Sequence, residues 1–330
     1  MPKPKVFVSR LIPPAGLDKV RAACDADVWT DALPPSADVL REKLKDCDGL
    51  LALLTDRIDG PLLDALPKLK VVSNYAVGFN NIDIPAATER GVMVGNTPGV
   101  LTDATADMAF ALLITAARRI VESQRYAMEG HWKTWEPLGH IGQDLAGRTI
   151  GIVGMGRIGL AMAKRCFGGW GMRVIYHDPH TNAEAESKLG ATRVDLPQLL
   201  AESDFISVHT DLNDTTRGMF NAAAFQRMKP TCVFVNTSRG PLVVEADLER
   251  ALREGWIFSA GLDVTDPEPP RTDSPLLTLP NCVVAPHIAS ATVSSRNAMA
   301  DIAADNLIAG VTGKPLRCCV NPEAEKNRRR

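Results

Sequence analysis

The chain has 330 residues, of which 45% are hydrophobic, 23% charged and 5% aromatic, and its formal net charge is −2. The length predicts about two domains with sizeable cores, and the composition excludes a disordered chain, a collagen and a repeat fibre. The near-neutral charge gives no general attraction to nucleic acid or to anionic membranes. The basic tail at residues 325–330, EKNRRR, is predicted to be a frayed, solvated end.

The seven cysteines show no CxxC and no Cys/His spacing typical of a zinc site. We therefore expect free thiols, no metal and a reducing, cytoplasmic location. The first ten residues hold no long apolar segment, and no apolar run approaches the roughly 20 residues that span a bilayer. Neither a membrane nor a nucleic acid is expected as a partner.

Short apolar runs alternate with helical stretches from the start of the chain, which is typical of a doubly wound parallel sheet. The segment SADVLREKLKD predicts a helix that Ser36 caps. After a break at Thr97-Pro98-Gly99, one long helix is predicted over residues 102–129, and we interpret it as a connector between domains. Strands are predicted within residues 5–8, 49–54, 70–74 and 92–95.

A second alternation begins at residue 149 and contains six apolar segments: TIGIV, RVIYH, FISV, CVFVN, SAGLD and CVVAP. Six strands are the full set of a dinucleotide-binding fold. A last helix, predicted within residues 290–313, has no strand to alternate with. We infer that it packs on the first domain, so that residues 1–101 and 291–330 form one domain and residues 102–290 the other. The alternative is a helix that covers the second domain.

A glycine motif marks the candidate cofactor site. Gly154, Gly156 and Gly159 lie between a strand and a helix, where they allow a tight turn and close approach of a pyrophosphate to the helix amino terminus. The next strand ends at Asp178, where a carboxylate can bind the ribose hydroxyls and would repel a 2′-phosphate. NAD(H) is therefore favoured, while His180 and distant arginines leave NADP(H) open.

Three polar side chains follow predicted strands, at the edge where ligands collect in an open α/β sheet. Arg239 offers a bidentate fork for a carboxylate, although alone it would be read as a surface arginine. Glu268 lies in the proline-stiffened loop DVTDPEPP, where Asp266 competes for the same role. His287 follows Pro286, and a lone histidine at a strand end is more often structural than catalytic.

Together these groups meet the needs of one reaction, the reduction of a 2-keto acid. That reaction requires a cation to hold the carboxylate and polarise the carbonyl, an acid to protonate the alkoxide, and a nicotinamide to deliver hydride. Arg239 suits the first role and the His287 imidazolium the second. Glu268, by accepting a hydrogen bond from the other ring nitrogen, would favour the imidazolium and fix its orientation.

Six motifs, in order, resemble those of the D-isomer-specific 2-hydroxyacid dehydrogenase family, within its glyoxylate/hydroxypyruvate reductase branch. They are SNYAVGFNNID, NTPGVLTDATADMAFALLITAARR, GIVGMGRIG, NTSRGPLVVE, AGLDVTDPEP and PHIASAT, and the resemblance covers about residues 5–322. It implies an α/β fold of two doubly wound parallel-sheet domains separated by a hinged cleft. One would be a discontinuous, flavodoxin-like substrate domain and the other a Rossmann NAD(P)-binding domain. A homodimer built around the long helix and the cofactor domain is also implied.

The resemblance assigns roles to residues of the second domain. It implies that Arg239, Glu268 and His287 are the catalytic set, which selects Glu268 over Asp266, and that Asp263 contacts the nicotinamide carboxamide. The implied cofactor-binding residues are Gly154, Gly156, Arg157, Ile158, Gly159, Asp178, His209, Thr210, Thr237, Ser238, Asp263 and Ala289.

The resemblance also implies a substrate site. The backbone amides of Val77 and Gly78 would hold the substrate carboxylate, together with Arg239 and His287. Trp135 would reach the substrate pocket of the neighbouring subunit. The alternative for Trp135 and for the nearby Trp132 is that both only anchor the dimer.

The implied activity is NAD(P)H-dependent reduction of glyoxylate and hydroxypyruvate to glycolate and D-glycerate, with His287 as the proton donor. Alternatives are another D-2-hydroxyacid dehydrogenase, of phosphoglycerate, D-lactate or phosphite type, and a dinucleotide-sensing, corepressor-like interaction protein. The chain departs from the family pattern at Asp211, where proline usually stands in a His-x-Pro-Leu turn. It departs again at Asp178, where many reductases carry a basic or neutral residue suited to NADP.

Overall fold

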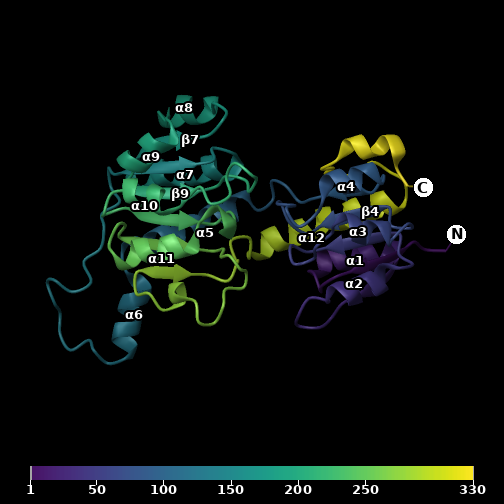
Figure 1. Ribbon diagram of the computed structural model, residues 1–330, viewed down its shortest axis with the longest axis horizontal. Helices are drawn as coiled ribbons and strands as arrows, with labels where there is room; N and C mark the ends of the chain where they lie inside the picture. Colours follow the sequence, from purple (N-terminus) through teal and green to yellow (C-terminus); the bar gives the residue numbers. More distant parts are fainter. Residues whose placement is uncertain (1, 330) are drawn as a thin grey trace. The chain divides into compact units, whose positions relative to one another are not determined.

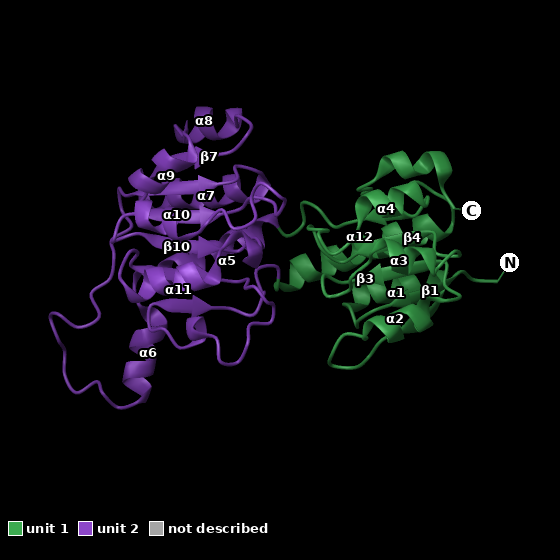
Figure 2. Ribbon diagram, in the orientation of Figure 1, with its two compact units in different colours: residues 1–101, 291–330 green, residues 102–290 purple. Residues whose placement is uncertain are grey.

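The computed structural model describes residues 2–329, which divide into two compact units (Figure 2). Unit 1 comprises the chain up to Leu101 together with the part from Ala291 onward, and unit 2 comprises Thr102–Ser290. Each unit contains one sheet, and all the strand pairs of both sheets are parallel. Within the described residues, no helix has both the length and the apolar character that crossing a lipid bilayer requires.

Unit 1 is built on a five-stranded sheet with the order β2-β1-β3-β4-β5, which is the flavodoxin-like order. The sequence predicts four of these strands and misses β2, DADV, because it has no apolar run. As an edge strand paired only to β1, it leaves Asp25 and Asp27 exposed. The strands are β1 (Lys5–Val8), β2 (Asp25–Val28), β3 (Gly49–Ala52), β4 (Val71–Asn74) and β5 (Met93–Gly95).

Helices cover both faces of this sheet (Figure 1). The Ser36 side chain caps α2 as predicted, since it accepts a hydrogen bond from the Val39 amide. Leu40 and Leu44 of α2 are buried in the core on that face. One face is covered by α2 (Ala37–Leu44), α3 (Gly60–Asp64) and α4 (Ile84–Glu89), and the other by α1 (Pro14–Ala23) and α12 (Val293–Val311).

The last helix, α12, belongs to unit 1, where it packs against α1 and against the sheet. It packs so closely on α1 that a Cβ on Gly16 would lie 2.2 Å from the Ala300 carbonyl oxygen. The Ser73 hydroxyl of β4 donates to the Ala303 carbonyl at 2.7 Å. Small residues in α12 and α1 therefore allow the helix to approach both its neighbour and the sheet.

The basic tail is bound to unit 1 as far as residue 329, so the prediction of a frayed end is wrong. It follows a short 3-10 helix, η3 (Pro322–Asn327). Arg328 donates to the Lys314 carbonyl beyond α12 at 2.8 Å, and Arg329 donates to the Leu66 carbonyl beyond α3 at 2.6 Å. Carbonyl groups at helix ends lack helical partners and attract cations, which explains why these guanidinium groups hold the tail in place.

Unit 2 is built on a seven-stranded sheet with the order β12-β11-β10-β9-β6-β7-β8. This is the dinucleotide-binding order with one further strand, so the prediction of six strands is one short. The strand that the sequence misses, β8, has only two residues and lies at the edge. The strands are β6 (Thr149–Val153), β7 (Arg173–His177), β8 (Thr192–Arg193), β9 (Phe205–Val208), β10 (Val233–Asn236), β11 (Ser259–Leu262) and β12 (Cys282–Val284).

Two separate apolar cores lie on the two faces of this sheet, each under its own layer of helices (Figure 1). One layer consists of α5 (Thr102–Ala117), α7 (Arg157–Trp170) and α8 (Ala183–Leu189). The other consists of α9 (Leu196–Glu202), α10 (Ala222–Arg227) and α11 (Glu245–Arg253). Two 3-10 turns, η1 (Gly240–Leu242) and η2 (Pro275–Leu277), lie in loops, and α6 (Ile120–Met128) buries none of its residues.

The single helix predicted over residues 102–129 is wrong, because the chain breaks it into α5 and α6 at Arg119. The backbone of Arg119 has a φ of 52°, in the left-handed region. The cause is a contact from far along the chain, where the Gln143 amide donates to the Ala117 carbonyl at the end of α5 at 2.9 Å. Arg119 then pairs with Glu122 at 2.6 Å in the first turn of α6.

Arg328→Ala should destabilise the protein, because the Arg328 side chain is only 8% exposed and holds the tail to α12. Hydrogen bonds from a charged donor contribute about 1.5–3 kcal/mol, so the free energy of unfolding in urea should fall by about 2 kcal/mol. Lys326→Ala, at an exposed position in η3, is the control and should change it by less than about 0.5 kcal/mol. Equal stability of Arg328→Ala and wild type would contradict a structural role for the tail.

Candidate active site

Three polar side chains follow neighbouring strands of unit 2. Arg239 comes after β10, Glu268 after β11 and His287 after β12, and these strands lie side by side. Because the strands are parallel, their carboxyl ends meet at one edge, which is where ligands bind in open α/β sheets. Adjacent strands are about 4.8 Å apart, so one small ligand can reach groups from several of them.

His287 is held in a fixed direction by its backbone and by one carboxylate. Its Nδ1 is hydrogen-bonded to Glu268 Oε1. Its backbone has a φ of 53°, a region that residues other than glycine rarely adopt, and its amide donates to the Ala285 carbonyl at 3.0 Å. With Nδ1 engaged, Nε2 is the nitrogen that can exchange a proton with a ligand. The carboxylate that contacts the histidine is that of Glu268. The other candidate, Asp266, has its backbone amide bonded to the Glu245 carboxylate.

Asp263 holds the segment that carries His287. Its two carboxylate oxygens accept hydrogen bonds from the amides of Ile288 and Ala289, at 2.8 and 2.7 Å. Burial raises the pKa of Asp263, while these two amides and the charge of His287 lower it. The sequence does not reveal this positioning contact, because its partners lie 25 and 26 residues away. The signal that could have found it is a carboxylate that ends the apolar segment SAGLD.

Arg239 presents a partly buried guanidinium at the end of β10. Its Nη1 donates to the Ser238 carbonyl at 2.7 Å. Burial lowers the pKa of Arg239, while the nearby carboxylates of Glu268 and Asp211 raise it. A planar guanidinium in this place can hold a carboxylate with two parallel hydrogen bonds.

Asp211, which stands where the family usually has proline, lies in the loop after β9, and its charge acts on Arg239. The strands β9 and β10 are paired in register, and the Ser238 hydroxyl donates to the Thr210 carbonyl at 2.5 Å, which ties the two following loops together. The Thr216 hydroxyl donates to the Asp211 carbonyl at 2.6 Å and closes the loop. Asp211 thus adds a negative charge near the Arg239 guanidinium without leaving the loop open.

Two of the three glycines in the motif lie where a Cβ would not fit. Gly154 has a φ of 92°, and a Cβ on it would lie 2.6 Å from the Thr210 amide nitrogen. A Cβ on Gly159 would lie 2.0 Å from the Gly154 carbonyl oxygen. A Cβ on Gly156, by contrast, would enter open space just before α7, which begins without a side-chain cap. The first amides of α7 are therefore available to a phosphate, and Gly156 leaves room for it.

Asp178 is fixed at the end of β7 by two backbone amides. Its carboxylate accepts hydrogen bonds from Met155 at 2.9 Å and from His180 at 2.8 Å. The Arg193 guanidinium donates to the carbonyls of Asp178 and Pro179, at 2.8 and 2.7 Å. A carboxylate in this place has the position of the ribose-binding acid of the dinucleotide fold.

The remaining predicted cofactor residues of β9, β10 and β12 fit a dinucleotide in different ways. Burial lowers the pKa of His209 to about 3, so its ring is neutral, and Nε2 contacts the Ser207 hydroxyl at 2.8 Å. The Thr237 hydroxyl is buried without a hydrogen-bond partner among residues 2–329, and such a group needs one from a ligand or from water. Ala289 is also buried, whereas Ser238 is partly exposed. Together with the glycine turn, the unpartnered hydroxyl fits a bound nicotinamide dinucleotide.

Three predicted substrate residues do not belong to this sheet edge. Val77 and Gly78 belong to unit 1, in the partly exposed loop after β4. Trp135 lies in the irregular segment after α6, and its side chain is 80% exposed. The structure therefore gives Trp135 no place in the candidate site of its own chain.

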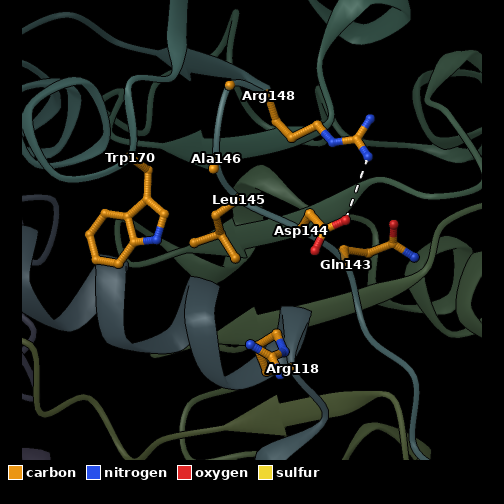
Figure 3. Close-up of a pocket in the computed structure, with 8 residues that line it drawn as sticks. Arg118, Gln143, Asp144, Leu145, Ala146, Arg148 and Trp170 are labelled. Atoms are coloured by element: carbon orange, nitrogen blue, oxygen red, sulfur yellow. Dashed lines mark ion pairs between the residues drawn. The ribbon is translucent and has the colours of Figure 1, made fainter. Parts of the chain in front are cut away.

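A surface pocket of unit 2 lies at the opposite edge of the sheet. It is lined by residues 143–148, which precede β6, by Trp170, which precedes β7, and by Arg118 (Figure 3). Arg148 and Asp144 form an ion pair of 3.9 Å at this pocket. Because these residues lie at the amino ends of the strands, the pocket is separate from the candidate active site.

Gly156→Ala should weaken cofactor binding and leave the stability of the fold unchanged. Its Cβ would meet nothing in the protein itself but would enter the space for the pyrophosphate. The Kd for NADH, measured by fluorescence titration, should rise at least about tenfold, while the melting temperature stays close to that of wild type. Gly168→Ala, at an open position of α7, is the matched control and should leave the Kd unchanged. An unchanged Kd in Gly156→Ala would show that the dinucleotide does not bind here.

Comparison with known proteins follows the same division of the chain. Residues 110–289 match the model of the D-isomer specific 2-hydroxyacid dehydrogenase, NAD binding domain. A glyoxylate reductase of Korarchaeum cryptofilum is 51% identical over 327 residues, which cover 99% of this chain and 98% of that protein. A crystal structure of a Thermus thermophilus protein is similar with a TM-score of 0.89 and 42% identity, over 96% of this chain and 99% of the other.

A structure with bound cofactor is among the similar proteins. The NADPH-dependent glyoxylate/hydroxypyruvate reductase of Sinorhizobium meliloti, in complex with NADP and malonate, has a TM-score of 0.83 and 33% identity, with 99% of both chains covered. The family model spans more than half of the chain, and these relatives span nearly all of it. The chain therefore belongs to the D-isomer specific 2-hydroxyacid dehydrogenase family.

Proposed function

We propose that this chain reduces glyoxylate and hydroxypyruvate to glycolate and D-glycerate, with NAD(P)H as the hydride donor. The observation that carries the proposal is the contact of His287 Nδ1 with Glu268, on the sheet edge that also holds the Arg239 guanidinium. A proton donor, a carboxylate that orients it and a cation for the substrate carboxylate are the groups that this reduction requires. The full-length similarity to glyoxylate reductases supports the choice of substrate.

The substrate carboxylate is held by a guanidinium and by backbone amides. Arg239 binds it through the two-pronged guanidinium and draws electron density from the neighbouring carbonyl. In unit 1, the backbone amides of Val77 and Gly78 donate to the same carboxylate. With the carboxylate of a small 2-keto acid held in this way, its carbonyl group remains free to react.

His287 transfers the proton. When bound, the nicotinamide ring supplies the hydride that reduces the carbonyl carbon. The proton on His287 Nε2 passes to the carbonyl oxygen, so that a C–H and an O–H bond form, the C=O double bond becomes a single bond, and the imidazole becomes neutral. Glu268 accepts the hydrogen bond from Nδ1 throughout, which favours the imidazolium before the transfer and keeps the ring oriented. In the oxidative direction, neutral His287 is the base.

Asp178 makes NAD(H) the preferred cofactor. Two backbone amides hold its carboxylate in place at the end of β7, so it cannot turn away from a ligand. A fixed negative charge binds the ribose hydroxyls of NAD(H) and repels the 2′-phosphate of NADP(H). Arg193, the cation on this turn, already donates to two carbonyls.

The working assembly is a homodimer. Helix α6 buries none of its residues, and the exposed fractions of Met128, Trp132, Trp135 and Leu138 are 79%, 69%, 80% and 82%. Large apolar side chains gathered on one exposed segment are typical of a protein–protein interface. In the dimer, Trp135 contributes to the substrate pocket of the neighbouring subunit. Sedimentation equilibrium that gives the mass of one chain would contradict this assembly.

The compartment we propose is the cytoplasm. All seven cysteines are free, and burial raises the pKa of Cys166 and Cys282 to about 12, so these two remain protonated thiols. Free thiols are the normal state of cysteine in a reducing compartment. Native disulfides in protein isolated without reductant would contradict this location.

A panel of 2-keto acids, assayed with NADH and with NADPH in parallel, tests the proposed function. The kcat/KM should be highest on glyoxylate or hydroxypyruvate, and it should be higher with NADH than with NADPH. A preference of about tenfold or more for pyruvate, 3-phosphohydroxypyruvate or a branched keto acid would contradict the substrate assignment, since such a factor is a difference of about 1.4 kcal/mol in transition-state binding. A preference for NADPH would contradict only the role of Asp178 and would leave the substrate assignment intact.

A further inference from the structure

The loop that follows β4 in unit 1 has three successive carbonyl groups occupied by donors. The side-chain amide of Asn96 donates to the Val77 carbonyl at 2.8 Å. The side-chain amide of Asn74 donates to the Gly78 carbonyl at 2.9 Å. The carbonyl before them, that of Ala76, accepts a backbone amide at 2.8 Å. Three peptide planes in a row are thus held by their oxygen atoms.

Fixing these carbonyls also directs the amide hydrogens of the loop. In a trans peptide unit, the carbonyl and the following N–H point in opposite directions. The amides of Val77, Gly78 and Phe79 therefore face away from the groups that hold the carbonyls. Within residues 2–329, none of these three amides donates a hydrogen bond, and the stretch is partly exposed. Successive free amides of this kind can bind an anion.

The asparagines are themselves anchored to regular structure. Asn74 is fully buried at the end of β4, and its side chain also contacts that of Asn81 at 3.2 Å. Asn81 donates to two carbonyls in the loop after β3, both at 3.0 Å. The backbone carbonyl of Asn96 accepts a hydrogen bond from Asn306 of α12 at 3.0 Å. We call Asn74, Asn81 and Asn96 the asparagine frame.

We propose that the asparagine frame positions this loop to bind the substrate carboxylate, and that the Phe79 amide is a third donor beside those of Val77 and Gly78. This inference rests on the proposed function, because it concerns the loop that holds the substrate. A side-chain amide suits the task because it donates to a carbonyl while it carries no charge. A carboxylate in its place would repel both the carbonyl and the anionic substrate.

The frame acts on substrate binding and leaves the chemical step unchanged. The carboxylate keeps the same charge in the substrate and in the transition state, so the loop binds both equally. Loss of such uniform binding raises KM and leaves kcat unchanged. In the proposed mechanism, the proton and hydride transfers depend on Arg239, Glu268 and His287, which belong to unit 2.

Asn96→Asp tests the frame with little change in volume. It replaces the donor to the Val77 carbonyl by a charged acceptor. The KM for glyoxylate should rise about tenfold, with kcat within about twofold of wild type. The Kd of oxamate, an unreactive carboxylate analogue, should rise by a similar factor, and the Kd of NADH should stay unchanged. Asn96→Ala should move these values in the same direction and replaces the first variant if that one does not fold.

Asn321→Asp is the matched control. Asn321 is a buried asparagine of unit 1 that accepts from the Val94 amide and donates to the Val92 carbonyl, at 2.8 and 3.0 Å. This variant should lower the melting temperature and leave the KM and the Kd of oxamate unchanged. The proposal is overturned if folded Asn96 variants keep the wild-type KM, if their kcat falls as far as their KM rises, or if the control raises KM equally. A wild-type protein that reduces no 2-keto acid would contradict the proposed function itself.

Discussion

The parallel pairing of β9, β10, β11 and β12 is the constraint on which the candidate active site depends. Parallel strands deliver the loops that follow them to one edge of the sheet, about 4.8 Å apart from strand to strand. Arg239, Glu268 and His287 are distant in sequence, yet each comes after one of three adjacent strands. The fold therefore supplies the proximity of the three groups, and the loops need only direct the side chains. A change that shifted the register of one of these strands would move the group that follows it away from the other two.

One carboxylate at this edge, that of Glu268, acts on both His287 and Arg239. Glu268 pairs directly with His287, and its charge also raises the pKa of Arg239, which burial lowers. The histidine is held in a left-handed backbone conformation, which costs on the order of 1–3 kcal/mol. The two hydrogen bonds from Ile288 and Ala289 to Asp263 contribute at least as much, since each bond to a charged acceptor is worth about 1.5–3 kcal/mol. Strain at the reacting group is thus offset by a buried carboxylate beside it.

Much of this architecture is visible in the sequence, because buried parallel strands are apolar runs and because the turn at Gly154 needs glycine. The edge strands β2 and β8 are not visible, since they are short and carry no apolar run, and every residue in them is exposed or only partly buried. The helix break at Arg119 depends on a contact from Gln143, which no local pattern reports. The same holds for the contacts of Asp263 and of the asparagine frame. Polar contacts between distant residues leave no periodic signal, although they decide where the reacting groups point.

The central claim is that His287, with Glu268 behind it, gives the proton to the 2-keto acid. The most direct measurement is the single-turnover rate of NADH oxidation by glyoxylate in wild type, His287→Ala and Glu268→Gln. The rate of His287→Ala should fall by about 10²–10⁴-fold, because a positioned general acid contributes a factor of that size. The rate of Glu268→Gln should fall by a smaller factor, because the glutamine can still accept the hydrogen bond from Nδ1, and both variants should bind NADH as wild type does. A wild-type rate in His287→Ala would contradict the account.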